Sequence, residues 1–148
     1  MGTRSTIALE FADNSVSQVY CHWDGYLENN GLILQESYMD PFKVRELLVL
    51  GDFSSLRETV EETGEGAYNK RSYEKDDGTI VFEVCDARRY MNVDEYFADC
   101  QQEEYDYILR NVEGQATWFV RCYATDGLWV TLGEAKALQE RMEEEGVY

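Results

Sequence analysis

The sequence lacks three features: a linker between domains, a signal peptide and a membrane-spanning segment. It has a single proline, Pro41, and no run rich in serine and glycine, so nothing indicates a linker between domains. No apolar run approaches the roughly 18 residues of a membrane span, and the N-terminus has neither the basic start nor the apolar core of a signal peptide. A length of 148 residues suits one domain, so we expect a single domain, residues 1–148, in the cytoplasm.

Histidine and cysteine are scarce as well. His22 is the only histidine, and four widely spaced cysteines form no CxxC pair: Cys21, Cys85, Cys100 and Cys122. Because zinc sites show paired ligand spacing and disulfides are typical of smaller chains, we expect no metal, no cofactor and four reduced thiols. Motifs of the P-loop, GxGxxG, GxSxG and HExxH types are also absent. The sequence therefore favours a non-enzymatic function.

Positive charge is in short supply too. Thirty acidic residues stand against thirteen basic ones, for a net charge of −17. Such a chain repels phosphate backbones and anionic lipids, which argues against nucleic acid or a membrane as a direct partner and favours a basic protein. The simpler interpretation is that the charge only keeps the protein soluble. Residues 61–148 carry twenty-one of the acids and nine of the bases, so most of the excess lies there.

Apolar residues, at 44% of the chain, are abundant enough for a folded core. They alternate with polar residues over 6–11 and again over 16–23, with the turn pair Asp13-Asn14 between the two runs, which predicts an N-terminal hairpin. The apolar segment 79–85 predicts a central strand of the sheet. The segments 105–110, 117–123 and 128–132 predict a three-stranded meander.

Capping residues predict the helices. Asp40, followed by proline, predicts a helix over 40–50. Two pairs have the spacing of a capping box and predict a helix after each cap, namely Asn92 with Glu95 and Thr131 with Glu134. The segment 26–38 suits a further helix, weakened by Asn29-Asn30-Gly31. We therefore expect an α+β fold with an antiparallel sheet of about five or six strands and three or four helices.

The motif VYCHWDGY at 19–26 holds the best candidates for catalysis. On a strand, Tyr20, His22 and Asp24 would share one face, where Asp24 could orient the imidazole as a general base. Cys21 would face the other way, which argues against a Cys–His nucleophile pair. The simpler interpretation is that His22 only makes hydrogen bonds within the fold. These three residues support the alternative function of a small-molecule- or nucleotide-binding protein, or an enzyme.

The acidic residues that follow Asn92 are the best candidates for binding a protein partner. Acids four positions apart on a helix lie about 6 Å apart along its axis, close to two phosphate steps of one DNA strand, so an acidic helix can imitate nucleic acid. The residues that would form this surface are Asp94, Glu95, Asp99, Glu103, Glu104, Asp106 and Glu113. The acids of 134–145 could extend the surface, and the ordinary alternative is a solvated helix face.

Three segments, GTRSTIALEF, VYCHWDGY and DPFKVRELLVLGDFSSL, together resemble a family of small proteins encoded by bacteriophages and prophages. The resemblance covers residues 2–56 and is loose from Thr59 onward. It carries over no catalytic residue and no cofactor. It implies a phage accessory protein in the host cytoplasm, and small acidic proteins of that kind frequently bind and inhibit a host enzyme.

Charge and resemblance together lead to one expectation about function. We expect a non-enzymatic phage protein that binds and inhibits a basic host protein, either a nucleic-acid-handling enzyme or a defence effector. Counter-defence of an anti-CRISPR-like kind, by nucleic-acid mimicry, would be its specific form. The remaining alternative is a structural role, for example as a homodimer.

Overall fold

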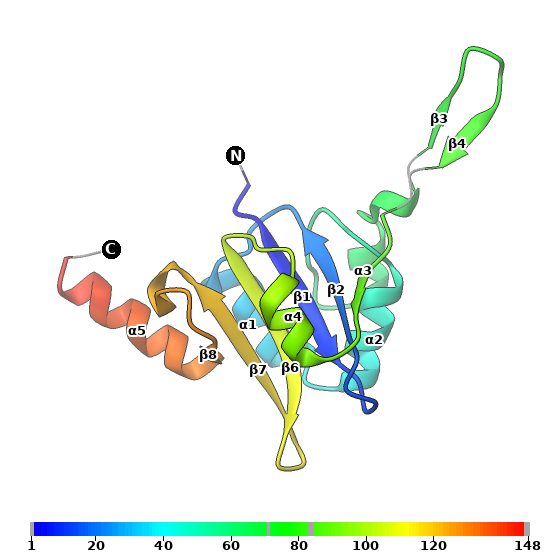
Figure 1. Ribbon diagram of the computed structural model, residues 1–148. Helices are drawn as coiled ribbons and strands as arrows, with labels where there is room; N and C mark the ends of the chain where they lie inside the picture. Colours follow the sequence, from blue (N-terminus) through cyan, green and yellow to red (C-terminus); the bar gives the residue numbers. More distant parts are fainter. Residues whose placement is uncertain (1, 71, 83–84, 147–148) are drawn as a thin grey trace.

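Residues 2–70, 72–82 and 85–146 are described by the computed structural model of the chain. Alternating apolar and polar residues form a six-stranded sheet in the order β5-β2-β1-β6-β7-β8, and a separate two-stranded sheet pairs β3 with β4 (Figure 1). The strands are β1 (Ser5–Glu10), β2 (Val16–Cys21), β3 (Ser72–Glu74), β4 (Ile80–Phe82), β5 (Arg88–Tyr90), β6 (Tyr105–Val112), β7 (Gln115–Cys122) and β8 (Val130–Thr131). The predicted α+β class is confirmed.

The large sheet joins the N-terminal hairpin to the C-terminal meander. The hairpin β1–β2 and the meander β6–β7–β8 both form with antiparallel pairing, as the sequence predicts. The sheet is mixed and not wholly antiparallel, because β1 and β6 lie side by side in parallel, with Thr6 opposite Asp106. Parallel neighbours need a long crossover connection, and the segment 11–104 supplies it.

The prediction of a central strand over 79–85 is wrong. Its described strand residues, in β4, pair with β3 in a hairpin that projects away from the large sheet (Figure 1). Ile80 is 55% exposed there, and the central places in the large sheet belong to β1 and β6. The apolar composition of 79–85 was the only signal for a central place, and composition does not fix a strand's partners. Residues 83 and 84 of the predicted strand lie outside the described residues.

Capping residues start the main helices where the sequence predicts them. Asp40 Oδ1 accepts from Phe42 N at 3.0 Å, and the Thr131 and Glu134 side chains close a full capping box. Asn92 Oδ1 accepts from Glu95 N, at 2.9 Å. The helices are η1 (Leu27–Gly31), α1 (Leu32–Ser37), α2 (Pro41–Val49), α3 (Val60–Gly64), η2 (Tyr68–Lys70), α4 (Val93–Asp99), η3 (Tyr123–Thr125) and α5 (Leu132–Glu144). The weak helix predicted over 26–38 is the π-helical η1 followed by α1.

Helices cover both faces of the large sheet, and the two faces differ in character. On one face, strand residues such as Ile7, Val19 and Tyr107 pack against α1 and α2 in the larger core. On the other face, Ala8 and Ile108 pack against α4 in a smaller core. Figure 1 shows α4 in front of the sheet and α1 behind it. The face under α4 also carries the polar residues of the site described below.

We expect Gly51→Ala to destabilise the protein by more than about 2 kcal/mol, because Gly51 has φ +73° and an added Cβ would meet the Cys85 carbonyl oxygen. That oxygen accepts a hydrogen bond from Asp52 N at 2.7 Å, which the alanine would disturb. Urea unfolding measures the effect. Gly133→Ala is the control, since its Cβ would meet no atom within 4 Å and α5 should gain up to about 1 kcal/mol. Similar changes for both variants would contradict this explanation.

Candidate functional site

A row of polar residues crosses the face of the sheet that lies under α4. In the strand register, Tyr20 on β2 lies opposite Thr6 on β1, Thr6 lies opposite Asp106 on β6, and Asp106 lies opposite Arg121 on β7. Side chains directly opposite one another on neighbouring strands are close enough to interact. The four residues come from four strands, and only the folded sheet brings them together.

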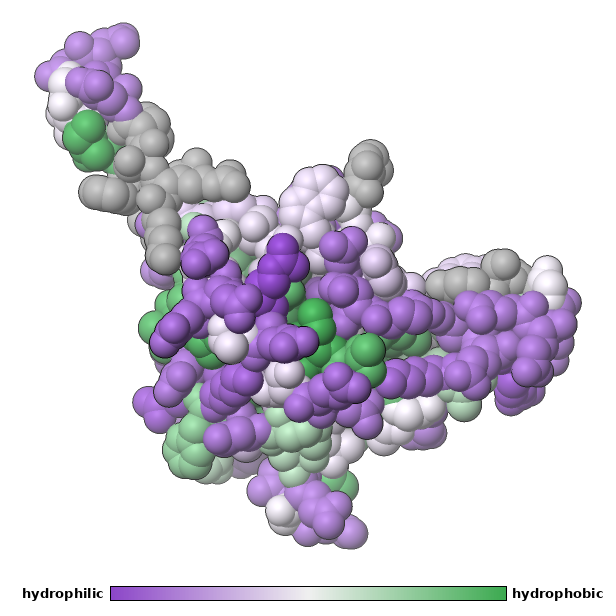
Figure 2. All heavy atoms as spheres, turned by 180° about the vertical axis from the view of Figure 1, so that it is seen from behind, coloured by the Kyte–Doolittle hydropathy of each residue, from purple (hydrophilic) through white to green (hydrophobic). Residues whose placement is uncertain are grey.

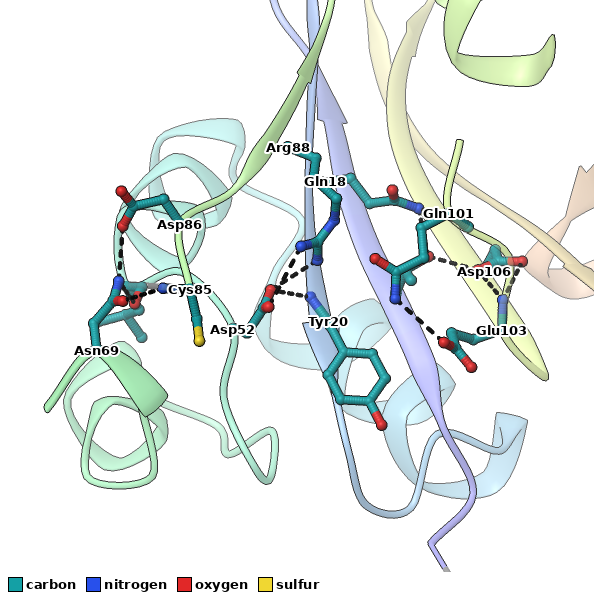
Figure 3. Close-up of polar contacts among 12 residues, drawn as sticks. Gln18, Tyr20, Asp52, Asn69, Cys85, Asp86, Arg88, Gln101, Glu103 and Asp106 are labelled. Atoms are coloured by element: carbon teal, nitrogen blue, oxygen red, sulfur yellow. Dashed lines mark hydrogen bonds and ion pairs between the residues drawn. The ribbon is translucent and has the colours of Figure 1, made fainter. Parts of the chain in front are cut away.

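Asp106 is the centre of this row. Its carboxylate accepts from Thr6 Oγ1 at 2.6 Å, from Arg121 Nη2 at 3.1 Å and from the backbone N of Glu103 at 3.1 Å. Gln18 Nε2 extends the network by donating to Thr6 Oγ1 at 2.9 Å and to the Gln101 carbonyl oxygen at 3.0 Å (Figure 3). The network therefore holds the segment 100–104, which follows α4, against the sheet.

Burial sets the chemistry of this network. Asp106 is 1% exposed, and its burial raises the pKa of its carboxyl, partly offset by the donors from Thr6, Glu103 N and Arg121. Arg121 Nη2 also donates to Cys100 Sγ at 3.4 Å, while burial raises the pKa of the Cys100 thiol. A thiol with a raised pKa is a poor nucleophile. The arrangement therefore fits structural support better than covalent catalysis.

A hollow of about 540 Å³ opens beside this network. The residues that line it include Glu103, Glu104, Asp106, Arg121 and Tyr123. Tyr123 is 73% exposed. Acidic side chains next to an exposed aromatic ring are a combination that a basic protein surface can bind.

Four carboxylates on and after α4 have no cationic partner among the described residues. Asp94 and Asp99 are exposed on α4, Glu104 is exposed on the segment that follows, and Glu103 is half-buried beside it. Among residues 2–70, 72–82 and 85–146, none of these four carboxylates forms an ion pair. We call Asp94, Asp99, Glu103 and Glu104 the acidic face.

The structure changes the membership of the predicted acidic surface. Asp106 does not belong to it, because its carboxylate is buried and bound within the sheet. Glu113 is exposed but lies in the β6–β7 turn, at the opposite end of β6 from Glu103. Glu95 is half-buried and accepts from Met91 N at 2.7 Å. Because α4 ends at Asp99, no single helix carries phosphate-like spacing from 94 to 104.

The predicted cluster of Tyr20, His22 and Asp24 forms only in part. A hydrogen bond of 2.7 Å joins the Tyr20 hydroxyl to His22 Nδ1. Strand β2 ends at Cys21, and Asp24 is exposed in a left-handed turn with φ +57°. Within the part of the chain that the structure describes, the Asp24 side chain makes no hydrogen bond to His22, so the carboxylate that would orient the imidazole is missing from the pair.

A second polar cluster joins β2 to residues that sequence reasoning did not connect. Asp52 Oδ1 accepts from Tyr20 N at 2.8 Å and from Arg88 Nη2 at 2.8 Å (Figure 3). Two residues before Arg88, Asp86 Oδ1 accepts from Asn69 Nδ2 at 2.9 Å. The partners in these contacts lie far apart in the sequence, and no motif with a fixed spacing predicts that they meet. The same holds for Thr6, Gln18 and Gln101.

The described ranges hold neither a cluster of metal-ligating side chains nor a membrane-spanning helix. No group of three or more His, Cys, Asp or Glu side chains there is placed to hold a metal ion, and no helix there is long and apolar enough to cross a bilayer. Cys21, Cys100 and Cys122 are buried free thiols in the described part of the chain. Comparisons with family models, curated proteins and solved structures found no match, so the geometry itself must carry the interpretation.

We expect Arg121→Met to cost about 3–5 kcal/mol of stability at pH 7, because Asp106 would stay buried without a cation. A carboxyl whose pKa is raised on folding favours the folded state at low pH and opposes it as the pH rises through the folded-state pKa. Removing Arg121 raises the pKa of Asp106 further. The stability lost by Arg121→Met should therefore be smaller at about pH 4, where Asp106 is more readily protonated and carries less charge. Urea unfolding at both pH values measures it.

A double variant controls for lost packing around Arg121. Adding Asp106→Asn to Arg121→Met leaves no unpaired buried charge, so at least half of the stability should return at pH 7. A loss that is the same at both pH values, and that the double variant does not relieve, would mean that charge pairing is not what Arg121 supplies.

Proposed function

We propose that the chain is a non-enzymatic phage accessory protein that binds and inhibits a basic host protein through its acidic face. The observation that carries the proposal is the set of carboxylates around α4 that have no cationic partner among the described residues. The resemblance of residues 2–56 to phage and prophage proteins supports the setting.

The electrostatics of the acidic face favour a cationic partner. Like charges held close together repel, and a partner that brings lysines or arginines relieves this repulsion and is attracted from a distance. Two arginines of the neighbouring strands β6 and β7 are already engaged, since Arg121 pairs with Asp106 at 3.1 Å and Arg110 with Glu10 at 3.3 Å. Tyr123, beside Glu103 and Glu104, offers an aromatic anchor of the kind that dominates many interfaces.

Charge, and not regular spacing, supports the choice of partner. Proteins that handle nucleic acid have basic surfaces for the phosphate backbone, and an acidic protein competes for such surfaces. We therefore propose a nucleic-acid-handling enzyme or a defence effector of the host, with anti-CRISPR-like counter-defence as the specific form. Imitation here would come from a patch of carboxylates on α4 and the following segment, because the helix is too short to carry a phosphate-like series.

One contact supports a second candidate function. The bond between Tyr20 and His22 is the kind of pair that can bind a small molecule or nucleotide, or shuttle a proton. The two functions are distinguished by variants. If His22→Ala abolishes the biological effect without lowering the melting temperature, while neutralising the acidic face leaves the effect intact, the second function is preferred.

We expect neutralisation of the acidic face to weaken binding of the host partner about tenfold, since three rim charges contribute roughly 0.5 kcal/mol each. The variant carries Asp94→Asn, Asp99→Asn and Glu104→Gln. The partner is isolated on the immobilised wild-type chain from bacterial lysate, purified, and its affinity measured at several salt concentrations. Affinity for the wild-type chain should fall steeply with salt, and less steeply for the variant.

The matched control removes three charges from the opposite side of the molecule. Glu36, Glu46 and Glu58 are exposed on or beside α1 and α2, behind the sheet in Figure 1, and their replacement by glutamine should leave affinity within about twofold. Equal weakening by both triple variants would show a general effect of net charge. A partner whose binding ignores salt would also count against the proposal.

A further inference from the structure

A second hollow, away from the acidic face, lies between η1 and α5 and measures about 400 Å³. Leu27, Glu28 and Leu32 line one side of it. Gln139, Glu140 and Glu143 line the other side, where their spacing along α5 places them on one face of the helix. Its volume lies within the usual range for small-ligand pockets, about 300–1,000 Å³.

Gln139 is the unusual residue of this hollow. It is only 6% exposed, and its Nε2 donates to Glu28 Oε1. Its other amide atom, Oε1, is buried and has no hydrogen-bond partner among the described residues. The orientation of the amide follows from chemistry, because the ionised carboxylate of Glu28 can only accept. Gln139 therefore presents a buried acceptor that requires a donor.

The charge of the lining indicates what that donor should be. Glu28, Glu140 and Glu143 are acidic, Lys136 is the one base that lines the hollow, and none of the four forms an ion pair in the described part of the chain. Figure 2, seen from behind, shows the α5 side of the molecule as mainly hydrophilic. A cationic donor would satisfy Gln139 Oε1 and reduce the repulsion between the carboxylates.

We propose that this hollow binds the side chain of an arginine from a basic polypeptide. The guanidinium group has five donors in one plane and can reach Gln139 Oε1 and a carboxylate together, while its aliphatic stem can lie on Leu27 and Leu32. A metal ion fits less well, since no group of metal-ligating side chains forms among the described residues. This hollow is independent of the proposed function, because none of the residues that line it belongs to the acidic face.

The test is an NMR titration of the isotope-labelled chain with N-acetyl-arginine amide at about 0.15 M salt, where exposed charges are screened within roughly 8 Å. Saturable shifts should appear in 27–32 and 136–143, including the side-chain amide of Gln139. The citrulline analogue has the same shape without the charge and should bind at least about tenfold more weakly. Equal binding of the two amides, or shifts that spread over all acidic segments without saturating, would overturn the proposal.

Matched variants separate this hollow from the general negative charge. Glu143→Gln should weaken arginine amide binding about threefold or more, whereas Glu144→Gln, which removes the same charge one residue away from the lining, should leave it within twofold. Gln139→Leu should abolish saturable binding, and Lys136→Gln should strengthen it. If Gln139→Leu fails to fold, the Glu143 and Glu144 pair still decides, because equal weakening by both would contradict a specific site.

Discussion

The parallel pairing of β1 with β6 is the contact on which the rest of the structure depends. It joins the N-terminal hairpin to the C-terminal meander and places Thr6 opposite Asp106 at the middle of the sheet. A carboxylate buried this deeply is costly unless donors surround it, and Thr6, Arg121 and the backbone of Glu103 provide them. One buried charge thus links three strands and fixes the segment that follows α4.

This internal pairing also shapes the outer surface. In the described part of the chain, three arginines form ion pairs, and all three lie on strands of the large sheet: Arg88, Arg110 and Arg121. Arg110 in addition lies over the Phe97 and Phe119 rings, which holds it against the sheet. Three of the chain's thirteen basic residues therefore neutralise carboxylates within the sheet and its neighbouring loop. Within the described residues, the carboxylates of the acidic face take part in no ion pair.

Local signals in the sequence predicted local structure well. The turn at 13–14 and the caps at Asp40, Asn92 and Thr131 act over a few residues, and the elements that they predict are present. Long-range pairing is not predictable from these signals, because no local pattern indicates that Thr6 forms a hydrogen bond with Asp106, 100 residues away in the sequence. Two errors follow from this limit. Apolar composition favours a central place for segment 79–85, and charge favours a surface place for Asp106, but the fold contradicts both. The sequence shows where the acids lie along the chain, but which of them are exposed together follows only from the fold.

The proposed function requires that a basic partner contacts the acidic face. Hydrogen–deuterium exchange of the chain, alone and bound to its purified partner, measures this contact segment by segment. Exchange should become slower on binding in 92–104 and around Tyr123, with α1 and α2 unchanged. Protection confined to α1 and α2, with 92–104 exchanging as in the free chain, would contradict it.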